Sequence, residues 1–143
     1  MAIRVEIKWD NDNELIKYLR KDLPKVVEQS LIEANNETAK DAKKYAKQYV
    51  PVDTGSLRKS IRVERLARPK GHFFYTGIRA GGYVRNPKTG RFVDYQRYVE
   101  YGTSRQRPQP FMRPAIRKAS RNWEGHLWKA LSKRVKIGRQ LDI

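Results

Sequence analysis

The sequence predicts an α+β domain in which a long N-terminal helix and a C-terminal helix pack on a small antiparallel β-sheet with a hairpin insertion. Two observations support this class. Apolar residues recur at helical spacing in the first and last thirds of the chain. Between them, short alternating segments are separated by turn-forming residues. A length of 143 residues suits one modest core, so we assign residues 1–143 to a single domain.

The first predicted element is a strand over Ile3–Trp9, because apolar and charged side chains alternate there. Helical spacing begins at Leu15, and Pro24 interrupts it. Since proline is tolerated only in the first turn of a helix, we expect a short helix to end near Asp22 and a long helix to run from Pro24 to about Tyr49. At 1.5 Å per residue the long helix is about 39 Å in length, enough to span a domain whose radius of gyration is about 14 to 15 Å.

The middle of the chain predicts the sheet. "SIRVERLA" and "GHFFYTGIRA" have the composition of strands, and "YVRNPKTGRFVDY" predicts a hairpin with its tip at residues 86–90, within an insertion of about residues 81–94. "RQRPQPF" is too rich in proline for a helix or a central strand, so we expect an extended arm over about residues 104–113. The C-terminal helix should begin near Pro114 and end before Gly138.

Basic residues dominate the last two thirds of the chain. Lys and Arg outnumber Asp and Glu by 10 to 9 over residues 1–50, by 11 to 4 over residues 51–103 and by 11 to 2 over residues 104–143. The formal net charge is +17. This asymmetry predicts contact with an acidic partner, either nucleic acid or an acidic protein surface, and a generally basic, well-solvated surface is the plainer alternative.

Composition also limits the setting. The chain has no cysteine, which removes disulfides, thiolate metal sites and cysteine nucleophiles and fits a reducing cytoplasm. No apolar run approaches the roughly 20 residues of a membrane span. The N-terminus alternates polar with apolar residues and lacks the apolar core of a signal peptide. We therefore expect a chain with no membrane contact that is made in the cytoplasm.

The stretch Asp53-Thr54-Gly55 has the letters of an aspartic-protease loop. Such an enzyme needs two carboxylates that share a proton, each on a loop of a nearly all-β fold, whereas here the motif follows a long helix. We predict instead that Pro51 ends that helix and that the Asp53 carboxylate accepts hydrogen bonds from the backbone N–H of Gly55 or Ser56. Gly55 would let the chain reverse direction into a helical turn.

Other catalytic arrangements also lack their parts. Neither His72 nor His126 lies near a pair of carboxylates that would complete a three-ligand metal site, and each is expected at the surface or half-buried. "RAGGYVRN" lacks the lysine of a phosphate-binding loop. The sequence therefore predicts no enzyme, no metal, no cofactor and no small-molecule substrate.

Two motifs occur in a fixed order after the long helix. The first matches V-P-V-D-T-G-x-L-x-x-S-I at Val50, Pro51, Val52, Asp53, Thr54, Gly55, Leu57, Ser60 and Ile61. The second matches V-E-Y-G-T and Q-P-F-x-R-P-A at Val99, Glu100, Tyr101, Gly102, Thr103, Gln109, Pro110, Phe111, Arg113, Pro114 and Ala115. In this order they closely resemble the neck or tail-completion family of long-tailed bacteriophages. The resemblance covers roughly residues 15–123, and residues 81–94 look like an insertion relative to shorter members.

The resemblance implies a non-enzymatic structural virion protein that completes the tail and joins it to the DNA-filled head. Its partners would be further copies of itself in a ring, with six as one candidate number, and the neighbouring connector and tail proteins. It would lie in the host cytoplasm before assembly and then in the virion. The motif residues expected to be structural are Pro51, Asp53, Thr54, Gly55, Leu57, Gly102, Thr103 and Pro114.

Contacts with a neighbouring subunit or partner are expected in and beside the arm, at Arg105, Arg107, Pro110, Phe111 and Arg113. For Phe111, packing in the protein's own core is an equal alternative. A second set of basic residues is expected to contact phage DNA or an acidic protein: Arg58, Lys59, Arg62, Arg117, Lys118 and Arg121. If the target is DNA, the contact would be salt-sensitive and independent of base sequence.

A different class of protein, a free basic nucleic-acid-binding protein, is the alternative function. It is supported by aromatic residues interleaved with arginines between residues 75 and 101. Aromatic side chains of this kind either stack on bases or fill a sheet core, and we favour the core. The residues concerned are Tyr75, Tyr83, Phe92, Tyr95, Tyr98 and Tyr101.

Overall fold

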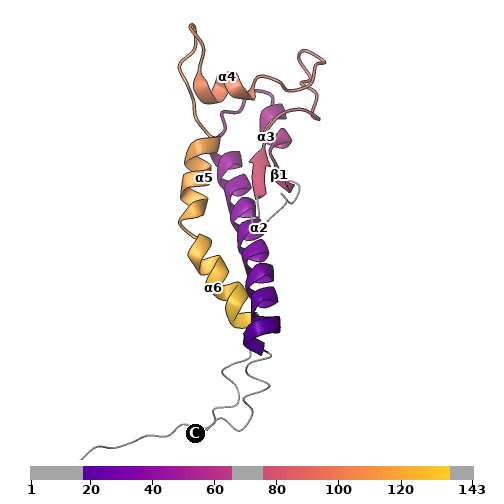
Figure 1. Cartoon of the computed structure of the whole chain (residues 1–143). Coiled ribbons are helices and arrows are strands. Elements are labelled where there is room, and N and C mark those ends of the chain that lie inside the picture. The colour runs from indigo at the N-terminus through magenta and orange to yellow at the C-terminus, as the bar shows by residue number, and fades with distance from the viewer. Residues whose placement is uncertain (1–17, 66–75, 136–143) are drawn as a thin grey trace, which may run out of the picture.

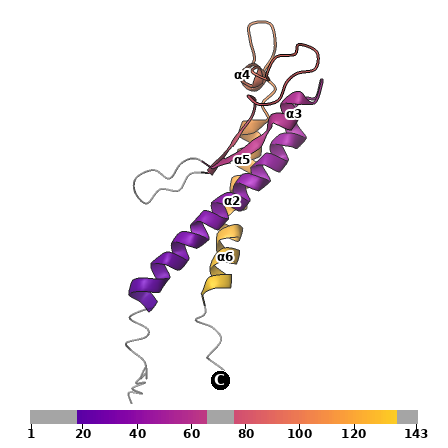
Figure 2. The same cartoon turned by 90° about the vertical axis from the view of Figure 1, so that its right-hand side faces the viewer.

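The structure, a computed structural model, describes residues 18–65 and 76–135. One long helix forms the axis of the molecule, two shorter helices follow one another along one side of it, and a small sheet lies against another side (Figures 1 and 2). The predicted α+β class is confirmed. The predicted strand Ile3–Trp9 and the residues His72 and Tyr75 lie outside the described residues.

The axis is α2, which spans Leu23–Tyr49, preceded by a turn of π-helix, η1, over Tyr18–Asp22. The predicted break before Pro24 is confirmed, because the proline lies in the first turn of α2 where its missing N–H costs nothing. The helix ends at Tyr49, and the next residue, Val50, is extended, as the residue before a proline usually is. Its buried positions all carry small side chains, which allow close packing of a second helix: Ser30, Ala34, Ala39, Ala42 and Ala46.

The prediction of a single C-terminal helix is wrong, because two helices follow one another in this part of the chain. α5 spans Met112–Ser120 and α6 spans Trp123–Arg134. The Ser120 hydroxyl donates to the Ile116 carbonyl at 2.8 Å, a bond to the preceding turn that bends helices, and Asn122 prefers a cap to a helix interior. Both helices turn alanines toward α2, namely Ala115, Ala119 and Ala130, all of which are buried.

Polar contacts hold α6 against the N-terminal half and the middle of α2. Glu33 pairs with Arg134 at 2.6 Å and with Lys133 at 3.1 Å. Hydrogen bonds from Arg134 and Lys133 lower the pKa of Glu33 below its ordinary value. Two further bonds join the helices, from Trp123 Nε1 to Asn35 Oδ1 at 2.9 Å and between His126 Nε2 and Asp41 Oδ2 at 2.8 Å.

The sheet contains two antiparallel strands among the described residues, β1 at Arg62–Arg65 and β2 at Thr76–Arg79. Val63 is opposite Ile78, and Ile78 packs against the core. Thr76 reaches α2, where its hydroxyl donates to Asn36 Oδ1 at 3.4 Å. One face of β2 is therefore turned toward α2.

Short elements complete one end of the molecule. α3 spans Ser56–Ser60 and α4 spans Gln96–Tyr101. The hairpin between β2 and α4 is confirmed with its predicted tip, where Asn86 N donates to Arg91 O and Gly90 N to Asn86 O, each at 2.8 Å. Its two sides are joined by one isolated bridge, Arg85 to Phe92, and not by regular strands.

Candidate partner-binding surface

The two sequence motifs meet in one core at the C-terminal end of α2. Val50, Leu57 and Ile61 come from the first motif, and Val99 and Phe111 come from the second. Phe111 is fully buried, with 0% of its surface exposed. The prediction that Phe111 contacts a neighbouring subunit is therefore wrong, because its side chain fills the core of its own chain.

The first motif builds a turn, though not through the residue we expected. The N-cap of α3 is Gly55, and the side chain that closes the preceding turn is Thr54 and not Asp53. Thr54 Oγ1 accepts from Ser56 N at 3.4 Å, and its hydroxyl donates to Ser56 Oγ at 2.9 Å. Asp53 is exposed and pairs with Lys88 at 2.6 Å. Pro51 restricts Val50 to an extended conformation, which ends α2 before this turn begins. Gly55 adopts a positive φ of 76°, which permits the predicted reversal.

Ser60 ties the first motif to the hairpin. Its buried hydroxyl donates to Leu57 O at 2.6 Å and accepts from Gly81 N at 2.8 Å. Arg62 Nη1 donates to Gly81 O at 2.8 Å and its guanidinium lies 4.7 Å from the centre of the Tyr83 ring. The two backbone polar groups of Gly81 are thus satisfied by Ser60 of the first motif and by Arg62, which directly follows it, so the start of the hairpin is bonded to this part of the chain.

Glu100 is the centre of the second motif, and sequence reasoning missed its role. The residue is 4% exposed. One carboxylate oxygen accepts from Phe111 N at 2.7 Å and Met112 N at 2.9 Å. The other accepts from Arg113 N at 3.1 Å and Arg113 Nε at 3.2 Å. The carboxylate therefore satisfies the otherwise unpaired N–H groups at the start of α5.

Two opposing effects act on the pKa of Glu100. Burial acts to raise it, and the hydrogen bonds from Met112, Phe111 and Arg113 outweigh burial, so the pKa lies below its ordinary value of 4.5. A sequence signal did exist: the first turn of α5 has no acidic residue and Phe111 at its N-cap has no polar side chain. Such a helix needs a cap from elsewhere in the chain.

Gly102 and Thr103 start the proline-rich arm. Gly102 has a φ of 74°, and a Cβ atom there would come within 2.8 Å of Gln106 O and of Pro108 N. Thr103 exchanges backbone bonds with Gln106, at 2.9 Å and 3.4 Å, and its Oγ1 also accepts from Gln106 N at 3.0 Å. Gln109 N donates to Val99 O at 2.8 Å. The arm is therefore a loop fixed at both ends, in place of a straight extended segment.

The arm projects beyond the end of α2, beside α4 (Figure 1). Every residue from 103 to 110 is exposed, including Arg105, Arg107 and Pro110. Arg113 differs from these, because it pairs with Glu100 and lies 5.0 Å from the centre of the Tyr101 ring. Pro114 lies within the first turn of α5, a favourable position for proline.

The candidate basic contacts do not form one patch. Arg58 and Lys59 are exposed on α3, and Arg117 and Arg121 are exposed on and just after α5. Arg62 instead bonds the hairpin, as described above. Lys118 lies over two rings of α2, 4.4 Å from the centre of Tyr45 and 5.9 Å from that of Tyr49.

The prediction that the interleaved aromatic side chains fill a sheet core is wrong for four of them. Tyr83, Phe92, Tyr98 and Tyr101 are 50% to 62% exposed, whereas Tyr95 is partly buried against the core. An arginine accompanies Phe92 as well as Tyr83 and Tyr101, since Arg85 lies 4.7 Å from its ring centre. The described strands are too short to include these residues, so the rings lie on loops and on α4.

The described residues contain no group of three or more His, Cys, Asp or Glu side chains that could hold a metal ion. Of the two histidines, His126 is half-buried against Asp41, as expected for a surface or half-buried residue. Within residues 18–65 and 76–135, no helix combines the length and the apolarity needed to cross a membrane.

The structure is thus an α+β scaffold of packed helices. Its two motifs form the core at the C-terminal end of α2, and a fixed arm with two arginines projects from that end. Over residues 13–102 the chain matches the family described as "Bacteriophage HK97-gp10, putative tail-component". The chain belongs to this family of phage tail components, and the resemblance to a neck or tail-completion family is consistent with it. Searches of curated proteins and of solved structures find no match.

Proposed function

We propose that this phage tail component is a non-enzymatic structural protein of the head-to-tail junction, which completes the tail and joins it to the DNA-filled head as a subunit of a ring. The observation that carries the proposal is the arm, residues 103–110. It is fully exposed yet held by backbone bonds to Val99 and within itself. A loop that is ordered before it binds loses less entropy on binding than a flexible loop does.

The chemistry of the arm favours an acidic protein partner. Arg105 and Arg107 are exposed and have no ion-pair partner among the described residues. Guanidinium groups bind carboxylates in a bidentate manner. Arg105, Arg107 and Pro110 would then contact a neighbouring subunit or an adjoining connector or tail protein. Arg113 would contribute indirectly by keeping the start of α5 in place, through its bonds to Glu100.

The other motif residues have structural roles in this proposal. Thr54, Gly55 and Leu57 form the turn that follows α2, and Gly102 and Thr103 form the base of the arm. The hairpin of residues 81–94 supports the first motif through Gly81. The domain therefore acts as a rigid holder for the arm.

The test compares two charge-matched double variants. Arg105→Ser with Arg107→Ser removes two charges from the arm, and Lys44→Ser with Lys129→Ser removes two exposed charges from the helices. The arm variant should lose self-association by ultracentrifugation and binding to isolated tails, while its helical circular dichroism is unchanged. The control should behave as the unaltered protein does. Unchanged association and tail binding by the arm variant would exclude the arm as the contact.

A free nucleic-acid-binding protein is the second candidate, favoured by the exposed aromatic rings with arginines beside them. Bases can stack on such rings. Arg117→Ser with Arg121→Ser should then flatten the salt dependence of duplex DNA binding by about 0.9 log–log units per lost phosphate contact. We expect this variant to leave DNA binding unchanged, because DNA must slide past a neck during ejection. Weakened DNA binding with normal tail joining would favour the second candidate.

A further inference from the structure

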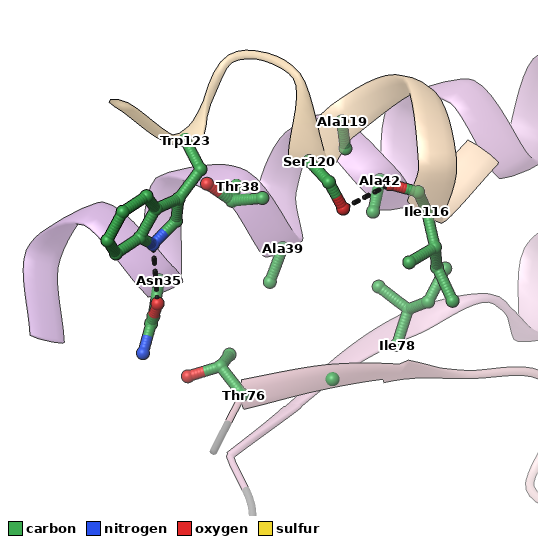
Figure 3. Close-up of a pocket in the computed structure, with 11 residues that line it drawn as sticks. Asn35, Thr38, Ala39, Ala42, Thr76, Ile78, Ile116, Ala119, Ser120 and Trp123 are labelled. Atoms are coloured by element: carbon green, nitrogen blue, oxygen red, sulfur yellow. Dashed lines mark hydrogen bonds between the residues drawn. The ribbon is translucent and has the colours of Figure 1, made fainter. Parts of the chain in front are cut away.

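A largely apolar groove of about 280 Å³ lies between β2 and the helices α5 and α6, over the middle of α2. Ile78 of β2 and Ile116 of α5 face one another across it, and Trp123 of α6 lies at one end (Figure 3). Ile116 is 47% exposed at this site. Since an engineered apolar cavity of about 150 Å³ holds a benzene molecule, the groove has room for a larger aromatic ring.

The same chain carries an aromatic ring that has no such site. Trp128 of α6 is 75% exposed, the highest value of any large apolar residue that the structure describes. Tryptophan is enriched among the residues that contribute most to protein–protein binding, where its ring fills a pocket from which water is excluded. Trp128 therefore has the properties of an anchor for a partner.

Trp128 points away from the groove of its own chain. Five positions separate it from Trp123, so the two side chains lie about 140° apart around α6. Ala130, which is buried on the face of α6 toward α2, lies about 160° from Trp128. One copy of the chain therefore presents the ring and the groove on different faces and does not join them.

We propose that the groove binds Trp128 of a second copy of this chain. The inference rests on the proposed function in one respect, because it supplies a contact between the subunits of the proposed ring. A contact between two different faces repeats from one copy to the next. Such a contact gives a closed ring if the rotation closes and an open filament if it does not.

Charges beside the two surfaces are complementary. Glu124 precedes Trp128 by four residues and lies on the same face of α6, and it is the one carboxylate among the described residues that follow Glu100. Arg117 is exposed next to Ile116 on α5. Neither Glu124 nor Arg117 has an ion-pair partner within residues 18–65 and 76–135. Glu124 of one copy and Arg117 of the next therefore attract one another when Trp128 occupies the groove.

Two single variants each remove one side of the contact. Trp128→Ala removes the ring, and Ile116→Lys places a charge in the groove. Each should weaken self-association, measured by analytical ultracentrifugation, at least about thirtyfold, as loss of a dominant interface residue does. Phe92→Ala is the matched control, because it removes an exposed aromatic ring from the hairpin, and it should leave self-association unchanged.

Mixing the two variants tests the pairing itself. The Trp128→Ala chain keeps only the groove, and the Ile116→Lys chain keeps only the ring. In equal amounts they should form dimers and no larger species, because the one contact that they can make has no free site from which to repeat. Both variants must retain the helical circular dichroism of the natural chain, and Ile116→Ser replaces Ile116→Lys if the lysine variant does not.

Self-association of natural strength in either variant would overturn the inference, as would a mixture without dimers or a natural chain that stays monomeric. Failure of the proposed function is distinguishable from these results. The variant with Arg105→Ser and Arg107→Ser keeps both Trp128 and the groove, so its self-association and tail binding test the arm alone. The joining of tails to heads tests the role at the junction whether or not the purified chain associates.

Discussion

At the residue scale, the second motif is explained by one buried carboxylate. Glu100 satisfies three backbone N–H groups at the start of α5 and also binds Arg113 Nε. A charged acceptor for such groups contributes more than a neutral one, and leaving them unpaired in a buried site is costly. The glutamate therefore fixes the distance between α4 and α5, and with it both ends of the arm.

The first prediction concerns Glu100→Gln. The amide has one acceptor oxygen in place of two, so the free energy of unfolding at neutral pH should fall by about 1 to 3 kcal/mol. Because the pKa of Glu100 is lowered in the folded state, its contribution is present above the unfolded pKa and is lost as the pH falls through the folded pKa. Urea unfolding between pH 6 and pH 3 should show a steeper loss for the natural chain than for the variant. Parallel curves would contradict this role.

A second residue-scale prediction compares two glycines that share a positive φ. Gly102→Ala and Gly55→Ala both incur backbone strain, at φ values of 74° and 76°. Only at Gly102 does the added methyl group meet backbone atoms, at 2.8 Å, whereas nothing lies within 4 Å at Gly55. Gly102→Ala should therefore lower the free energy of unfolding by clearly more than the roughly 1 to 2 kcal/mol of left-handed strain expected at Gly55. Equal losses would show that the arm moves away freely.

At the element scale, the sequence predicted those helix ends and turns that depend on residues close together in the chain. The break before Pro24, the end of α2 at Tyr49 and the hairpin tip at Asn86 follow from residue types whose preferences act within a few positions. The division between α5 and α6 did not follow. Apolar spacing continues across Ser120 and Asn122, and the bend depends on a side-chain bond that periodicity does not report.

The candidate site was predictable only in part, for a related reason. The motifs marked the right segments, and Gly55 and Gly102 do occupy positions that require glycine. The sequence could not decide between two positions for Phe111, because an aromatic residue beside prolines suits an interface and a core equally. Nor could it reveal that Glu100 caps α5, since that contact joins residues eleven to thirteen positions apart.

The prediction at this scale concerns α6. Gly125 is exposed within the helix, and a Cβ atom there meets nothing within 4 Å. Gly125→Ala should raise the free energy of unfolding by about 0.5 to 1 kcal/mol, because alanine loses less conformational freedom in a helix. Urea denaturation monitored by circular dichroism measures the change. A loss of stability would contradict a regular helix at this position.

At the scale of the whole molecule, the packed helices and the core form a scaffold, and the exposed arm lies at one end of it. Small residues let α5 and α6 lie close along α2, and the larger core residues gather at one end, beneath the arm. The excess of positive charge is distributed over several surfaces, with some cations engaged within the chain, as Arg62 and Lys118 are. Charge alone therefore does not define a nucleic-acid-binding face. The family and the fixed arm together favour an assembly role.

The measurement that tests the central claim most directly is the joining of tails to DNA-filled heads in an extract that lacks this protein. Adding the purified natural chain should restore joined particles, counted by electron microscopy. Adding the Arg105→Ser with Arg107→Ser variant should not, although the Lys44→Ser with Lys129→Ser control should. If heads and tails join equally well without the protein, or if the arm variant restores joining as fully as the natural chain does, the claim that the arm acts at the head-to-tail junction is wrong.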